Sequence, residues 1–412
     1  MVLISARFAS FLSYGAVATA ALISPAAAQE LDRATPLLEA PSEYDPVPIQ
    51  LGRIAAFVGA DARLEYDSNI YALPSNEIDD MRFTASPWVN LQMKDDTLDL
   101  GLQARAVVRR YFDNKTENSE SGSVRFNGVF KLSGSDSISG QAGWLRLVEE
   151  RGEPEGLNIT NIGPRKYDQL RGELGYTHEG ARITLGLKGG VLHNNALRSI
   201  DAERDYNQYT GSARVGYRVS GIITTFGEVF IAAREFRLPV DSSGIDRDSK
   251  TYGARGGVSF EPGGLIRGEA GIGVFRFEPD AATQDSRTGL SVSAALTYTP
   301  TPRLVITLDG FRGDVATVRS GAQSRTDTRL RLGFQNEIYH NLRWQGAVIY
   351  RRSSFLGSAQ HERTLAGLLE LEYLLNRNIA FAITGRLASR NSTIDLDDFD
   401  RSILGGEIRF QY

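Results

Sequence analysis

The chain has 412 residues, with 46 lysine and arginine against 50 aspartate and glutamate residues, a formal charge of −4 and no cysteine. The absence of cysteine excludes a disulfide scaffold, a thiolate zinc site, an iron–sulfur cluster and a thiol nucleophile. The 4 histidines are too widely spaced for an H-x-x-x-H metal pair, and the near-neutral balance argues against nucleic-acid binding. We therefore predict no catalytic centre, no metal site and no cofactor.

The first 28 residues have the composition of a cleavable secretory signal peptide. Positive charge in Met1–Arg7 precedes an apolar stretch from residue 8 to residue 23, and Ala26-Ala27-Ala28 supplies the small residues for cleavage before Gln29. The apolar stretch is too short for a transmembrane anchor. We expect residues 29–50, which contain four prolines and mainly acidic charges, to form an extended periplasmic linker, with a docking peptide as the alternative.

From residue 52 onward, apolar and polar residues alternate with a period of two. In the first such segment the apolar positions are Ile54, Ala56, Val58, Ala60, Ala62, Leu64 and Tyr66. A helix would need a spacing near 3.6, so the alternation predicts a β-strand. Segments of this length exceed the strands of soluble sheets, and at about 3.3 Å per residue they are long enough to cross an outer membrane.

The same alternation recurs eighteen times along the chain. The predicted strands are 52–67, 81–94, 97–112, 121–133, 137–149, 167–179, 181–193, 206–220, 222–237, 250–261, 265–278, 287–299, 303–313, 326–339, 342–352, 362–375, 378–389 and 400–412. Short connections alternate with long ones, which is typical of an even barrel with both ends in the periplasm. We predict an all-β fold: one transmembrane antiparallel β-barrel, residues 51–412, with about 18 strands, short periplasmic turns and longer extracellular loops.

Two local features of the strands carry further predictions. The strand at 222–237 has apolar residues on both faces, because Phe226 and Phe230 lie opposite Val229 and Ile231. The last strand ends the chain in an alternating aromatic pattern. We predict that Phe410 and Tyr412 are a signal for the barrel assembly machinery, and that the barrel lies in outer-membrane lipid and lipopolysaccharide.

Two short motifs resemble the opening of the putative β-barrel porin 2 family of proteobacteria. They are Tyr66-Asp67-Ser68-Asn69-Ile70-Tyr71 and Ser86-Pro87, and the likeness extends loosely from about residue 52 to residue 412. Members of that family often accompany exopolysaccharide export machinery. The resemblance therefore implies an exit for a polysaccharide and a periplasmic polysaccharide-export protein as a partner.

The strand face opposite the apolar one should point into an aqueous lumen, and basic residues outnumber acidic residues on it. The predicted channel-lining residues are Arg105, Arg109, Arg125, Arg171, Arg329, Arg331 and Arg343. Such a lining would favour anions, although arginine–glutamate pairs that only brace the wall are the alternative.

The long connection from residue 150 to residue 166 is the predicted constriction. It holds Glu150, Glu153 and Glu155, which we expect to face Arg105, Arg109, Arg125 or Arg171 across the lumen; an outward, mobile loop is the alternative. The predicted function is a passage for exopolysaccharide, with an acidic polymer expected. A general porin for small anions and a non-conducting structural or adhesion barrel remain as alternatives.

Overall fold

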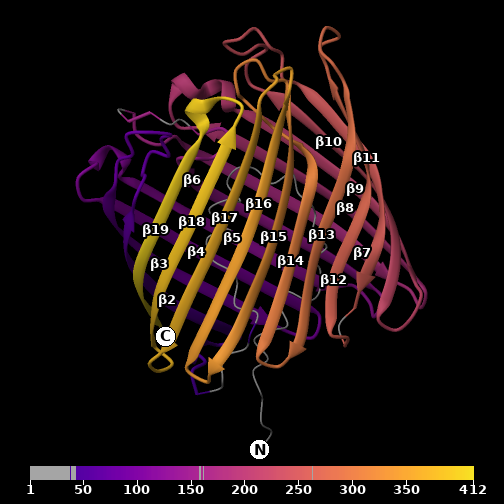
Figure 1. Cartoon of the computed structure of the whole chain (residues 1–412). Coiled ribbons are helices and arrows are strands. Elements are labelled where there is room, and N and C mark those ends of the chain that lie inside the picture. Colours follow the sequence, from indigo (N-terminus) through magenta and orange to yellow (C-terminus); the bar gives the residue numbers. More distant parts are fainter. Residues whose placement is uncertain (1–37, 39–42, 157–158, 161, 262) are drawn as a thin grey trace, which may run out of the picture.

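The computed structural model describes residue 38 and residues 43–156, 159–160, 162–261 and 263–412; the predicted signal peptide lies outside these residues. The described residues form one antiparallel sheet closed into a barrel (Figure 1). The strands are β1 (Ile49–Leu51), β2 (Ile54–Asp67), β3 (Asp80–Lys94), β4 (Leu98–Tyr111), β5 (Ser119–Lys131), β6 (Asp136–Val148), β7 (Lys166–Glu179), β8 (Ile183–Ala196), β9 (Tyr206–Arg218), β10 (Ile223–Phe236), β11 (Ser249–Phe260), β12 (Ile266–Pro279), β13 (Arg287–Thr301), β14 (Leu304–Val315), β15 (Ser324–Tyr339), β16 (Leu342–Leu356), β17 (His361–Leu374), β18 (Ile379–Ser392) and β19 (Phe399–Gln411).

The barrel itself comprises the 18 strands β2 to β19, which confirms the predicted fold. Each strand pairs with the next, and β19 returns to pair with β2 from Ile403↔Asp67 to Gln411↔Gly59. Beyond that point, Tyr412 and Val58 exchange two backbone hydrogen bonds of 2.8 and 3.3 Å. The ring therefore has no free edge at the junction of its first and last strands, as a lipid environment requires.

The chain just before the barrel is also bound to it. The short strand β1 pairs with Ile54–Ala56 of β2, so Ile49 and Gln50 of the predicted linker belong to the sheet. Leu38 is buried, and its backbone N–H donates to the side-chain oxygen of Gln335 at 3.3 Å. Because Gln335 lies on the lumen face of β15, one residue of the predicted linker contacts the barrel interior.

The two faces of each strand differ as the alternation predicts. Outward-facing aliphatic side chains are largely exposed on the protein surface, for example Leu174 at 68% and Leu387 at 66%. In a membrane barrel this exposed apolar surface is covered by hydrocarbon. Charged side chains such as those of Glu228 and Arg255 project to the other side, into the lumen.

Strand β10 keeps this alternation although both of its faces carry apolar residues. Phe226 and Phe230 point into the lumen, where the guanidinium carbons of Arg214 and Arg255 lie 3.6 and 4.7 Å from their ring centroids. Such a cation–π contact gives an aromatic ring a favourable place on a polar face. Gly257 makes room for the Phe226 ring, since a Cβ there would lie 2.6 Å from it.

The extracellular end of the β14–β15 hairpin bends into the barrel. β13 pairs with β12 from Arg287 onward, but it pairs with β14 only from Val292 onward. The carboxylate of Asp314, on β14, accepts hydrogen bonds from Arg234 on β10 at 2.7 Å and from Thr251 on β11 at 3.0 Å. Since β10 and β11 lie three or four strands away, the end of this hairpin lies inside the lumen.

The remaining regular elements are short 3-10 turns: η2 (Lys115–Glu117), η3 (Ser199–Arg204) and η4 (Asp395–Asp397). Over the described part of the chain, no helix has the length and apolar character needed to cross a membrane.

Deleting Phe410–Tyr412 should prevent closure of the barrel. The deletion removes the pairing of Phe410 with Ile379 and Ala60 and the bonds between Tyr412 and Val58. We expect the folded, heat-modifiable band to be lost from outer-membrane fractions on electrophoresis. The double variant Phe410→Ala/Tyr412→Ala, which keeps the backbone, separates closure from side-chain recognition. A normal heat-modifiable band from the truncated chain would contradict the prediction.

Candidate functional site

The seven predicted channel-lining arginines all project from the lumen face. Arg105 pairs with Asp61, Arg171 donates to the side-chain oxygen of Gln169 at 2.7 Å, and Arg331 lies 3.7 Å from Asp309. Arg329 pairs with Asp327 at 2.9 Å. The others are placed by register or by the loop: Arg125 lies opposite Gln103, Arg343 lies opposite Glu337 and Glu372, and Arg109 contacts Glu150. They are distributed around the wall over β4, β5, β7, β15 and β16.

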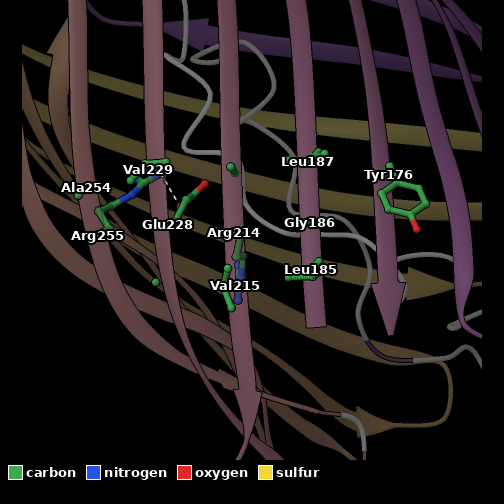
Figure 2. Close-up of a pocket in the computed structure, with 12 residues that line it drawn as sticks. Tyr176, Leu185, Gly186, Leu187, Arg214, Val215, Glu228, Val229, Ala254 and Arg255 are labelled. Carbon is green, nitrogen blue, oxygen red and sulfur yellow. Dashed lines mark hydrogen bonds and ion pairs between the residues drawn. The ribbon is translucent and has the colours of Figure 1, made fainter. Parts of the chain in front are cut away.

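Much of the wall is held together by ion pairs within a strand or between nearby strands. Arg255 on β11 pairs with Glu228 on β10 at 3.0 Å, as the dashed line in Figure 2 marks. Arg409 on β19 contacts Glu407 at 2.8 Å and Glu370 at 2.9 Å, and it also pairs with Glu372. These contacts brace the wall, as the alternative interpretation of the lumen arginines predicts.

Residues 149–156 of the loop between β6 and β7 cross the lumen. Glu150 contacts Arg109 on β4 at 2.7 Å, and Glu153 contacts Arg351 on β16 at 2.7 Å. β16 stands eight strands from β6 by the shorter way round the ring of 18, almost directly across the barrel. The loop therefore reaches from one wall to the opposite one near the extracellular end.

Glu155 joins this loop to the inward-bent hairpin. It accepts hydrogen bonds from the hydroxyl of Thr317 at 2.7 Å, from the backbone N–H of Val318 at 3.2 Å and from Arg325 at 2.6 Å. Arg325 is fully buried and also pairs with Asp327 at 3.0 Å. We call residues 149–156 of this loop, together with the β14–β15 connection 316–323, the plug.

Two further contacts fix the path of the loop. Arg151 pairs with Glu117 at 2.7 Å, and the carbonyl of Gly152 accepts a hydrogen bond from Arg390 on β18. Gly152 has φ +82°, and a Cβ at this position would lie 2.9 Å from the ring of Phe399. Only glycine combines this backbone conformation with so close an approach.

Of the arginines expected to face the loop, Arg109 contacts a loop glutamate, Glu150. Glu153 and Glu155 contact Arg351 and Arg325, which were not expected. The reason is the reach of the loop, which carries Glu153 and Glu155 toward the far wall. Arg325 and Asp327 share their strand face with Arg329, so alternation alone could have identified them as lumen residues.

A small polar cavity of about 70 Å³ lies in the lumen wall between β2, β3 and β15–β19. Its lining includes Arg63, Glu65, Arg82, Arg331, Arg386 and Glu370. Glu65 already pairs with Arg82 at 2.9 Å and with Arg63 at 3.6 Å. The cavity is therefore a polar space among paired charges.

The larger hollow, of about 470 Å³ (Figure 2), belongs to the outer face of β7–β11. Its lining includes the outward side chains of Leu187, Val215 and Val229, which are 55%, 58% and 58% exposed. In a membrane, hydrocarbon would cover this surface. We therefore do not assign it to the path of a solute.

The plug carboxylates differ in their acidity. Burial raises the pKa of Glu150, but Arg109 and Arg82 lower it by more, so this pKa lies below its usual range. The pKa of Glu155 is lowered in the same way, against burial, chiefly by Arg325 and Arg204. Burial raises the pKa of Glu149 above its usual value despite Arg204 and Arg165. The first two glutamates therefore stabilise the plug when ionised, and ionisation of Glu149 opposes it.

The plug should keep its stability from neutral pH down to the range in which ordinary glutamates titrate, and lose it progressively below. A carboxylate with a lowered pKa contributes stability above its unfolded pKa of about 4.3 and loses it only as the pH falls through the lower folded value. The protection of the amides of residues 149–156 from hydrogen exchange, relative to the unfolded chain, should thus stay high from pH 7 to about pH 4.5 and fall below it. Because ionised Glu149 opposes the plug, Glu149→Gln should slow exchange at pH 7. Rapid exchange already at pH 6 would contradict these assignments.

The chain is similar in sequence to one protein family and in fold to several solved barrel structures. The sequence of residues 40–412 matches the family described as putative beta-barrel porin 2. No curated protein sequence matches the chain. Similar solved structures include a BenF-like porin from Pseudomonas fluorescens Pf-5, with 10% identity and a TM-score of 0.45 over 87% of this chain and 99% of that chain. OccK5 (OpdH) of Pseudomonas aeruginosa has 14% identity and a TM-score of 0.42 over 87% and 98%.

The copper transporter OprC has 9% identity and a TM-score of 0.44 over 89% of this chain and 84% of that chain. The family and these structures are porins and transporters rather than enzymes. The family match covers the whole barrel, from β1 to the last residue. The chain belongs to the putative beta-barrel porin 2 family.

Proposed function

We propose that the barrel is an outer-membrane channel through which an acidic polysaccharide leaves the cell. The family supports a porin-type channel. The observation that carries the choice of solute is that three lumen arginines bind carboxylates of the plug: Arg109, Arg325 and Arg351. A polymer with a carboxylate on its sugar units offers the same chemical group at repeated intervals.

The plug then acts as an internal competitor of the polymer. The side chains of Arg109 and Arg351 are 16% and 12% exposed beneath the loop. The guanidinium group of each contacts one glutamate at 2.7 Å. Arginine binds carboxylates through directional, charge-assisted hydrogen bonds. An incoming uronate group could replace Glu150 or Glu153 on these arginines without leaving a buried charge unpaired. The exchange would open the lumen only while polymer occupies it.

The cavity lined by Arg63 and Gln345 lies on the same interior surface. A periplasmic polysaccharide-export protein would deliver the chain to the periplasmic end of the barrel, and the barrel assembly machinery would insert the barrel. Both partners belong to the proposal.

A general porin for small anions is the second candidate. It is favoured by the arginines that line the wall and by a loop folded inward across the lumen, which would set a size limit. A non-conducting anchor is the third, and the closed plug favours it. Conductance and polymer secretion separate the three.

Removing residues 152–163 should open the lumen. The deletion removes Glu153 and Glu155 and leaves β6 and β7 intact. We expect a higher single-channel conductance in planar bilayers and a reversal potential of the anion-selective sign under a salt gradient. Cation selectivity would overturn the anion channel. A folded deletion variant without conductance would support the non-conducting anchor.

The single substitution Glu155→Gln should weaken the plug without shortening it. It keeps a hydrogen-bonding side chain at Thr317 but leaves the buried Arg325 with Asp327 as its remaining partner. Removing one partner of a buried pair costs roughly 3–5 kcal/mol, so frequent channel openings are expected. Glu120→Gln, at an exposed ion pair on the outer surface, is the matched control. Equal opening frequencies for the two variants would remove Glu155 from this role.

The polymer itself decides between the first two candidates. In cells that secrete an acidic polysaccharide through this barrel, Arg109→Ala/Arg351→Ala should reduce polymer on the cell surface while folded barrel persists. The permeability of the same cells to small anions provides the second measurement. Normal secretion together with reduced uptake of small anions would favour the general porin.

A further inference from the structure

Two arginines face each other directly on the outer surface of the barrel. Arg352 on β16 lies opposite Arg363 on β17 in the ladder. Their chain neighbours point inward, since Arg351 contacts Glu153 at 2.7 Å and Glu362 contacts Arg319 at 2.9 Å. Arg352 and Arg363 therefore point outward. Like charges directly opposite each other destabilise a sheet unless an anion lies between them.

Elsewhere on the extracellular rim of the outer surface, four basic residues have acidic partners. Arg110 pairs with Glu120 at 2.7 Å, and Arg146 pairs with Asp168 at 2.8 Å. Arg276 pairs with Glu278 at 2.7 Å, and Lys250 pairs with Asp280 at 3.2 Å. These four pairs show how the barrel normally neutralises a cation at this level.

The arginine pair has no such partner within the described part of the chain. The outward positions of β15, β16, β17 and β18, all of them described, include no aspartate or glutamate. The Nε of Arg352 is buried and has no hydrogen-bond partner among the described residues. Beyond β18, the acid Asp400 of β19 lies opposite Ser389, so a whole strand separates it from Arg363. Positive charge is concentrated here without a protein counterion.

The surroundings of the pair define the missing anion. Thr328 and Asn391 flank the pair in the same row, next to Arg352 and Arg363 respectively, and can donate further hydrogen bonds. One rung closer to the middle of the membrane, Leu365 is 57% exposed and Tyr350 is 37% exposed. β16 ends only four residues beyond Arg352, at Leu356. The row thus lies where lipid head groups meet hydrocarbon, on the orange strands at the front of Figure 1.

We propose that Arg352 and Arg363 bind the phosphate of an anionic lipid in the outer leaflet of the membrane. Phosphate matches the planar, charge-assisted donors of two guanidinium groups. The acyl chains of the same lipid lie along the apolar outer face below, against Leu330, Val348 and Leu365. This site is independent of the lumen and goes beyond the proposed channel function.

Lipid retention by the purified full-length chain tests the site. The probe is bisphosphorylated lipid A, added in detergent and detected by native mass spectrometry, with the dephosphorylated lipid as the comparison. We expect Arg352→Ala/Arg363→Ala to reduce retention of the phosphorylated lipid by about tenfold or more, equivalent to at least ~1.4 kcal/mol. The control Arg276→Ala disturbs a paired arginine at the same rim and should retain lipid as the unsubstituted chain does.

A second variant separates binding from stability. Arg363→Glu places a carboxylate opposite Arg352 and so creates the kind of pair found elsewhere on the rim. It should abolish the preference for phosphorylated lipid while the thermal midpoint in detergent stays equal or rises. Equal retention of lipid by all variants, or equal retention of phosphorylated and dephosphorylated lipid, would overturn the proposal. An equal loss in Arg276→Ala would also overturn it, because the effect would then belong to the rim in general.

Discussion

The pairing of every backbone polar group governs the architecture of this protein. A strand in hydrocarbon cannot leave an N–H or a C=O exposed, so the sheet must close on itself. Here β19 meets β2, and Tyr412 continues the closure through Val58. Closure with 18 strands encloses a lumen too wide for wall side chains to fill. The inward loop and the inward-bent hairpin follow from that surplus of space.

Filling the lumen with charged groups creates a second constraint. A buried charge is costly unless a partner lies close to it. The interior therefore consists of linked pairs such as Arg255 with Glu228 and Arg325 with Glu155. The wall arginines that the sequence distributes over many strands acquire their partners partly from neighbouring strands and partly from the plug. Bracing of the wall and attraction of anions are thus properties of one set of side chains.

The sequence could predict the wall of the barrel much better than its contents. A period of two assigns each residue to a face, and this was enough to place all seven predicted arginines in the lumen and to locate all 18 strands. It also held for β10, where Phe226 pairs with Arg214 rather than with lipid. A loop has no repeating pattern of residues from which its path could be predicted. The contacts of Glu153 with Arg351 and of Gly152 with Arg390 join residues 198 and 238 positions apart, and local pattern does not encode them.

The gap in the ladder between β13 and β14 has a mechanical consequence. Residues Arg287–Ser291 have no partner on β14, because the end of that strand lies inside the barrel. An unsatisfied strand edge is a template for new pairing. If the end of the β14–β15 hairpin moved outward, β14 could form ladder hydrogen bonds with β13 while the hairpin separated from Glu155. The protein would then exchange side-chain ion pairs for main-chain hydrogen bonds, so that emptying the pore and completing the wall become a single movement.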